Sequence, residues 1–158
     1  MRKNVKQSFV KALILWIYAA IGLFSFAWIY FWHPVCKTEP AQLWASSNAM
    51  HPCLLGGRWV SSLSLVCTVI ALIMLFYRHG IVRYILAVVA AVLNVVAILL
   101  PTQFGLICKA PQMRCRTETF PTTNILHTVG VILILIWLIW SLIEAQQVRV
   151  AVENQRRA

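Results

Sequence analysis

Four long apolar blocks constrain the fold of this chain more than any other feature. Each block runs 17 to 21 residues without an Asp, Glu, Lys or Arg. That is the length a helix needs to cross the roughly 30 Å hydrocarbon core of a bilayer. The blocks cover residues 12–32, 60–77, 84–100 and 125–143. The sequence therefore predicts an all-α integral membrane protein, a bundle of four transmembrane helices that forms a single membrane domain over residues 1–158.

Composition agrees with a membrane protein. Hydrophobic residues make up 61% of the chain and charged residues only 11%, with a mean hydropathy of +0.78, unlike a soluble domain. The first block could be a cleaved secretory signal, since basic residues precede it. However, it is longer than the roughly 7–15 apolar residues of such signals and is rich in Trp and Phe. We expect it to be retained as a span.

The chain has a formal net charge of +10, and its basic residues are distributed unevenly between the expected connections. The N-terminus, the second connection and the C-terminal tail carry nine of the fourteen basic residues, and the first and third connections carry the other five. This bias predicts cytoplasmic termini in the plasma (inner) membrane, with the first and third connections extracytoplasmic. Because the charge is distributed by topology, a nucleic-acid partner is disfavoured and the lipid bilayer is the expected surroundings.

Four of the five cysteines fall in the two outer connections: Cys36, Cys53, Cys108 and Cys115. An oxidising compartment favours two disulfides among them. Three pairings are possible, and pairing within each connection, Cys36 with Cys53 and Cys108 with Cys115, needs the fewest assumptions. Cys67 lies within the second block, where a lone thiol is typical of a small core residue.

The two halves of the chain, 1–77 and 78–158, share a short pattern. CKTEP with MHPC in the first half corresponds to CKAP with MRC in the second. Both halves are expected to start in the cytoplasm, so the pattern predicts a parallel internal repeat of two helical hairpins. Such a repeat would place the two Cys- and Met-containing outer loops side by side.

These loops also permit a metal-binding interpretation. Thiolate and thioether ligands are soft and favour Cu(I), although disulfide-bonded sulfurs are poor ligands. The candidate copper ligands are Met50, His51, Cys53, Cys108, Met113 and Cys115, to which His33 or His127 could add an imidazole.

Two other chemistries are weaker alternatives. A thiol–disulfide redox protein usually carries a C-x-x-C motif, which is absent from this sequence. His33 and His127 are both expected near the outer interface and could in principle ligate haem between helices. Single interfacial histidines are more often solvated, so haem is disfavoured and no cofactor is predicted. An enzyme is not expected, with redox activity as the alternative.

The spans contain few polar groups. Asn94 is the single amide within them, and we expect it to hold a helix contact by hydrogen bonding. Ala87 and Ala91 form a small surface that serves either internal packing or a partner. Together with the outer basic residues, they make up the candidate partner-contact set: Ala87, Ala91, Lys109, Arg114 and Arg116.

The segment from Leu99-Leu100-Pro101 through Cys108, Met113, Cys115 and Pro121 resembles a known family. These are small four-span prokaryotic membrane proteins catalogued as a domain of unknown function, with a Cys…Met-x-Cys hallmark outside the membrane. In the first half, Met50 and Cys53 are one residue further apart than this hallmark. The resemblance implies an accessory role beside an ABC transporter permease. We therefore expect a non-enzymatic subunit of a larger membrane complex, with an extracytoplasmic Cu(I)-binding or thiol-redox protein as the alternative.

Overall fold

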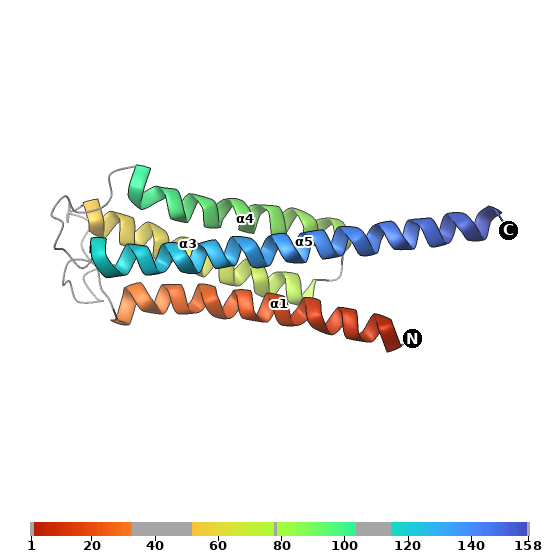
Figure 1. Ribbon diagram of the computed structural model, residues 1–158. Coiled ribbons are helices and arrows are strands. Elements are labelled where there is room, and N and C mark those ends of the chain that lie inside the picture. The colour runs from red at the N-terminus through yellow and green to blue at the C-terminus, as the bar shows by residue number, and fades with distance from the viewer. Residues whose placement is uncertain (1, 33–51, 78, 104–114, 158) are drawn as a thin grey trace.

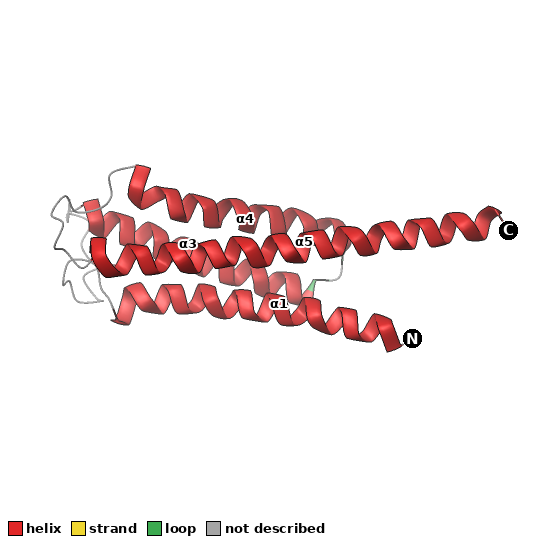
Figure 2. Cartoon of the chain, viewed as in Figure 1, coloured by secondary structure: helices red, strands yellow, loops and turns green. Residues whose placement is uncertain are grey.

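The computed structural model describes residues 2–32, 52–77, 79–103 and 115–157. It contains four long helices: α1 (Arg2–Ala27), α3 (Pro52–Phe76), α4 (Gly80–Gln103) and α5 (Phe120–Arg157). The π-helical turn η1 (Trp28–Trp32) continues α1, and a second π-helical turn, η3 (Cys115–Thr119), leads into α5. No strand occurs within these ranges (Figure 2). The predicted all-α architecture is confirmed.

The helices form an antiparallel bundle. α1 packs mainly against α3 and α5, and α4 packs mainly against the same two helices, so α1 lies diagonally opposite α4 and α3 lies diagonally opposite α5. Both ends of the chain lie at one end of the bundle, where α3 also turns into α4 (Figure 1). This arrangement confirms the predicted four-helix bundle.

All four helices are long and apolar enough to cross a membrane. The candidate spans are Phe9–Trp32, Cys53–Phe76, Gly80–Gln103 and Cys115–Arg157. They exceed the apolar blocks of the sequence because the helices continue into polar flanks. Pro52 opens α3 without breaking it, since the first helical position needs no backbone donor, and α4 ends two residues after Pro101. The chain is a multi-pass membrane protein.

The bundle interior is layered. A large apolar cluster near the α3–α4 turn contains side chains from all four helices, among them Leu15, Met74, Ala90 and Trp137. A smaller cluster near the opposite end contains Ile29, Cys53, Val60, Cys115 and Phe120. Outward faces remain apolar and exposed, as on α4: Ile81, Val82, Ile85, Val88, Val89, Val92, Val95, Val96 and Leu99. Exposed apolar faces of this kind suit a lipid environment.

Candidate functional site at the centre of the bundle

A layer of buried polar side chains adjoins the large apolar cluster on the side facing the smaller one, and every long helix contributes to it. None of its members is more than 7% exposed: Tyr18, Ser25, Ser64, Thr68, Asn94 and His127. We call this set the central polar layer. Polar side chains inside a membrane bundle are rare and face the interior, where they bind one another or backbone carbonyls.

Hydrogen bonds of the central polar layer cross the bundle along both diagonals. Asn94 on α4 donates from Nδ2 to the hydroxyl of Tyr18 on α1, at 2.5 Å. His127 on α5 and Ser64 on α3 are joined across the other diagonal, with Nε2 and Oγ 3.1 Å apart. The two diagonals meet at a 2.7 Å contact between Nδ1 of His127 and Oδ1 of Asn94. One connected network therefore reaches all four helices.

The chemistry of the Asn94 amide fixes the tautomer of His127. The Nδ2 group of Asn94 also donates to the carbonyl of Ala90 at 2.7 Å, and Cys67 Sγ lies 3.5 Å from it. The amide oxygen is an acceptor only, so the proton of the 2.7 Å contact belongs to Nδ1 of His127. The Nε2 atom of the same ring faces Oγ of Ser64, 3.1 Å away.

Ser64 has more acceptors in reach than its single proton can serve. Its Oγ lies 2.8 Å from the carbonyl of Val60 and 3.2 Å from Oγ of Ser25, besides the 3.1 Å contact with His127. When the hydroxyl donates to His127, it can still accept from Ser25. Serine side chains in transmembrane helices commonly satisfy a carbonyl four residues earlier, and the Val60 carbonyl offers Ser64 that alternative.

Two glycines make room for this layer. A Cβ at Gly130 on α5 would lie 3.0 Å from Oδ1 of Asn94 and 3.3 Å from the Tyr18 ring. A Cβ at Gly22 on α1 would collide with the Thr68 hydroxyl and lie 3.1 Å from the Ser64 carbonyl. Small residues allow transmembrane helices to approach closely, and here they allow polar side chains to reach across the bundle axis.

The sequence predictions for these residues have mixed outcomes. The expected helix contact of Asn94 is confirmed by its bonds to Tyr18 and His127. The prediction that His127 lies at the outer interface is wrong, because η3 and α5 begin well before it and bury it two turns inside the α-helix. Tyr18 and Ser64 were missed. The available signal was that each apolar span carries a few hydrogen-bonding side chains, which must find partners within the bundle.

The predicted disulfide at Cys115 is wrong. Cys115 is a free, buried thiol, and so is Cys67. Cys53 is not a free thiol. A bond from Cys53 to Cys36 or Cys108 stays a prediction, because those two residues lie outside the described ranges.

The predicted copper ligands are not assembled by the described parts of the chain. Met50, His51, Cys108 and Met113 lie outside those parts, as does His33. Cys53 and Cys115 are both buried in the apolar cluster near the loop end. Within residues 2–32, 52–77, 79–103 and 115–157, no three His, Cys, Asp or Glu side chains form a group that could hold a metal ion.

The predicted partner surface on α4 is also revised. Ala87 is fully buried in the large apolar cluster and Ala91 packs against that cluster. Their internal packing role is therefore confirmed, and the prediction that Ala87 faces a partner is wrong. Arg116 is exposed on η3, and Lys109 and Arg114 lie outside the described residues.

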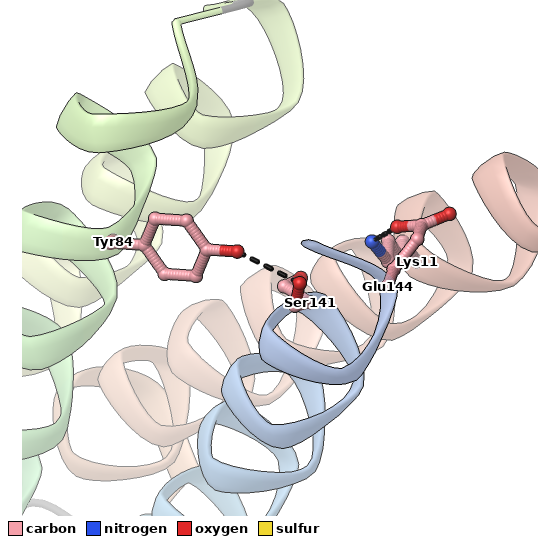
Figure 3. A network of polar contacts seen from close by, with 4 residues as sticks. All are labelled: Lys11, Tyr84, Ser141 and Glu144. Atoms are coloured by element: carbon pink, nitrogen blue, oxygen red, sulfur yellow. Dashed lines mark hydrogen bonds and ion pairs between the residues drawn. The ribbon is translucent and has the colours of Figure 1, made fainter. Parts of the chain in front are cut away.

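A second set of polar contacts lies at the end of the bundle that carries the termini (Figure 3). Lys11 on α1 forms an ion pair with Glu144 on α5. The Tyr84 hydroxyl on α4 donates to the Ser141 carbonyl on α5 at 2.9 Å. These contacts tie α5 to both of its neighbours.

Comparison with known proteins gives a family but no activity. No curated protein and no solved structure matches the chain. A family model described as "Domain of unknown function (DUF4418)" matches residues 16–152, a stretch that contains the whole central polar layer. Because this match covers most of the chain, the protein belongs to that family, a small membrane protein family of unknown function.

Proposed function

We propose that this protein is a non-enzymatic accessory subunit of a larger membrane complex, with an ABC transporter permease as the partner class. The observation that carries the proposal is the projecting end of α5. Figure 1 shows α5 running beyond the other helices. Every side chain from Ala145 to Arg157 is exposed, so the rest of the described chain does not cover this segment.

One face of the projecting segment has the pattern of a helix-packing surface. A shallow groove on α5 is lined by Ile143, Gln146, Gln147, Val150, Ala151 and Asn154. Their spacing of three and four residues places them on one stripe of the helix. The stripe is uncharged, whereas Arg149, Glu153 and Arg156 lie off it. We call it the α5 stripe and propose that a helix of the partner subunit packs on it.

Rigidity of the bundle supports a docking role. The central polar layer joins all four helices through directional hydrogen bonds, which restricts their sliding and rotation. A pre-organised subunit loses less conformational entropy when it binds a partner. The bundle then acts as a fixed base from which α5 presents its stripe.

The test is co-purification from native membranes with substitutions on opposite faces of α5. Val150 lies on the α5 stripe and Val152 does not, although both are exposed, at 59% and 46%. Two residues along a helix correspond to about 200° of rotation. Val150→Glu should therefore abolish capture of a permease subunit, identified by mass spectrometry, whereas Val152→Glu should retain it. Equal capture by both variants and the wild-type protein would contradict docking on the stripe.

Thiol–disulfide exchange is a second candidate function, favoured by one observation. Cys115 is a free thiol in the same buried cluster as Cys53, which is not free. If Cys53 is bonded to Cys36 or Cys108, attack by the Cys115 thiolate would form a new disulfide with one sulfur and release the other as a thiolate. Such an exchange needs no outside oxidant.

Alkylation and peptide mapping test this second candidate. The protein is alkylated without reductant, once directly in native membranes and once after the membranes have been incubated to allow exchange. The alkylated and the disulfide-bonded cysteines are then mapped. Exchange predicts a mixture of species in which Cys115 is alkylated in some molecules and disulfide-bonded in others. If Cys115 is alkylated in every molecule once the protein has been completely unfolded, it forms no disulfide. That result would contradict the exchange and would favour the accessory role alone.

A further inference from the structure

We propose that a groove at the end of the bundle carrying the termini binds the phosphate group of an anionic phospholipid. The groove has a volume of about 480 Å³ and lies between α1, α4 and α5. Its polar lining consists chiefly of Lys11, Arg83, Trp137, Ser141, Glu144 and Arg149. Figure 3 shows the contacts that Lys11, Ser141 and Glu144 make beside it.

The charge of the groove favours an anion. Three basic side chains line it against one carboxylate, and that carboxylate, on Glu144, is already paired with Lys11. The Arg83 guanidinium lies 5.1 Å from the centre of the Trp137 ring. Stacking on an aromatic face holds the planar guanidinium in position, and a positioned guanidinium binds phosphate oxygens through two parallel hydrogen bonds.

Unpartnered polar atoms of two residues that line the groove point to a ligand independently of the charge. Trp137 and Ser141 are only 2% and 6% exposed. Within the described chain, neither the indole Nε1 of Trp137 nor the Oγ of Ser141 has a hydrogen-bond partner. Nε1 is a donor only and Oγ can donate. Both atoms are sealed from solvent beside the groove. Phosphate oxygens are acceptors, so a phosphate that displaces the covering side chains would supply the partner that each group lacks.

The start of α4 adds to the attraction. Gly80, the first residue of α4, lines the groove, and a Cβ there would meet no other atom within 4 Å. Helix N-termini carry a partial positive charge and unsatisfied backbone donors, and they bind phosphate readily. The open space at Gly80 leaves this end of α4 accessible.

The surroundings of the groove indicate a lipid as the source of the phosphate. Val148 lines the groove and is 60% exposed, and Ile81, next to Gly80, is 77% exposed. A lipid would place its acyl chains along such apolar surface while its phosphate meets Arg83. Basic pockets at the ends of transmembrane helices bind anionic head groups in this way.

Native mass spectrometry of the full-length protein in detergent tests the proposal. The protein is incubated with phosphatidylglycerol or phosphatidylcholine of equal chain length, and retained lipid is counted. Wild-type protein should retain phosphatidylglycerol preferentially. Arg83→Gln should reduce that retention about tenfold, the factor that corresponds to the loss of one charge-assisted hydrogen bond to the phosphate. Arg83→Lys keeps the charge and should retain an intermediate amount.

The matched control is Arg156→Gln, which removes one positive charge from the exposed tail, away from the groove lining. This control should leave retention unchanged. Trp137→Phe keeps the aromatic ring and removes the indole donor, so it should weaken retention without loss of helicity by circular dichroism. Equal retention of the two lipids by the wild-type protein, or equal loss in Arg83→Gln and Arg156→Gln, would overturn the proposal.

A separate arm distinguishes a lipid from a free phosphate. Millimolar inorganic phosphate is added to the protein–phosphatidylglycerol complex at constant ionic strength. A site for lipid should keep its phosphatidylglycerol, because the acyl chains add contacts that inorganic phosphate lacks. The control is sodium chloride at the same ionic strength. Complete displacement of phosphatidylglycerol by inorganic phosphate, with none by sodium chloride, would show a free-phosphate site and overturn the lipid assignment.

Discussion

Nδ1 of His127 and Oδ1 of Asn94 lie 2.7 Å apart at the point where the two diagonals of the bundle meet. His127 comes from α5 and Asn94 from α4, which are neighbours. Each then reaches the helix diagonally opposite its own, His127 toward Ser64 on α3 and Asn94 toward Tyr18 on α1. A rotation of any one helix would break part of this network, so the contact fixes which faces of the helices point inward.

Coupling between His127 and Asn94 should be measurable. In a double-mutant cycle with Asn94→Ala and His127→Ala, each single variant should lower the free energy of unfolding in micelles by about 1–3 kcal/mol, because each leaves buried polar groups unpaired. The double variant should cost less than the sum, with a coupling of about 1 kcal/mol. Additive costs would contradict a direct bond.

Gly130→Ala should destabilise the bundle although alanine is the better helix former. The new methyl group would lie 3.0 Å from Oδ1 of Asn94, so the central polar layer must shift. Alanine gains about 1 kcal/mol over glycine in helix propensity, and we expect the displaced hydrogen bonds to outweigh that gain. Thermal unfolding in detergent gives the measurement.

Gly80→Ala is the matched control for Gly130→Ala. A Cβ at Gly80 would meet nothing within 4 Å, so its melting temperature should stay within a few degrees of the wild-type value. A higher melting temperature for Gly130→Ala than for the wild-type protein would show that the layer accommodates a methyl group, contrary to the expectation.

The sequence was sufficient to predict the helical bundle, but not to predict which helix faces point into its interior. Four uncharged blocks of membrane-spanning length leave few alternatives to a helical bundle, and the structure has that bundle. Helix rotation was harder to predict, because α4 turns its small residues inward and its large apolar side chains outward, the reverse of a soluble helix. For this reason the sequence allows a partner surface at Ala87, which the structure buries fully.

For the candidate site, the role of a single residue could be predicted from the sequence, but the network that it joins could not. Asn94 stood out as the one amide in the spans, and its role in a helix contact followed from the cost of leaving it unpaired. The partners of Asn94 did not follow, since hydrogen bonds along a diagonal depend on how four helices are arranged. The sequence predicts Cys115 in a connecting loop, whereas the helical segment begins at that residue and buries it.

The ion pair between Lys11 and Glu144 should contribute asymmetrically to stability. The Lys11 side chain is 13% exposed and that of Glu144 is 36% exposed. Glu144→Gln leaves the more buried charge unpaired, so it should cost about 1–2 kcal/mol, whereas Lys11→Met should cost less than about 1 kcal/mol. Chemical unfolding in micelles gives both values.

Glu153→Gln provides the reference for an exposed pair on the same helix. Glu153 and Arg157 are paired at 2.6 Å, with side chains 64% and 76% exposed. Such a pair contributes about 0.3–0.5 kcal/mol. A cost for Glu144→Gln no larger than for Glu153→Gln would show that the Lys11–Glu144 pair does not hold α1 to α5.

Accessibility labelling should place both termini in the cytoplasm. The two ends of the chain lie at one end of the bundle, and basic residues are concentrated in the N-terminus, the turn after α3 and the end of α5, which favours cytoplasmic exposure. A cysteine introduced at exposed Asn154 should therefore resist a membrane-impermeant maleimide in intact cells and react after the cells are opened. Arg116→Cys, exposed on η3 at the opposite end, should react in intact cells. The unsubstituted protein measures the background from its own cysteines. Labelling at position 154 but not at 116 in intact cells would reverse the topology, and the basic groove proposed to bind phospholipid would then lie in the outer leaflet.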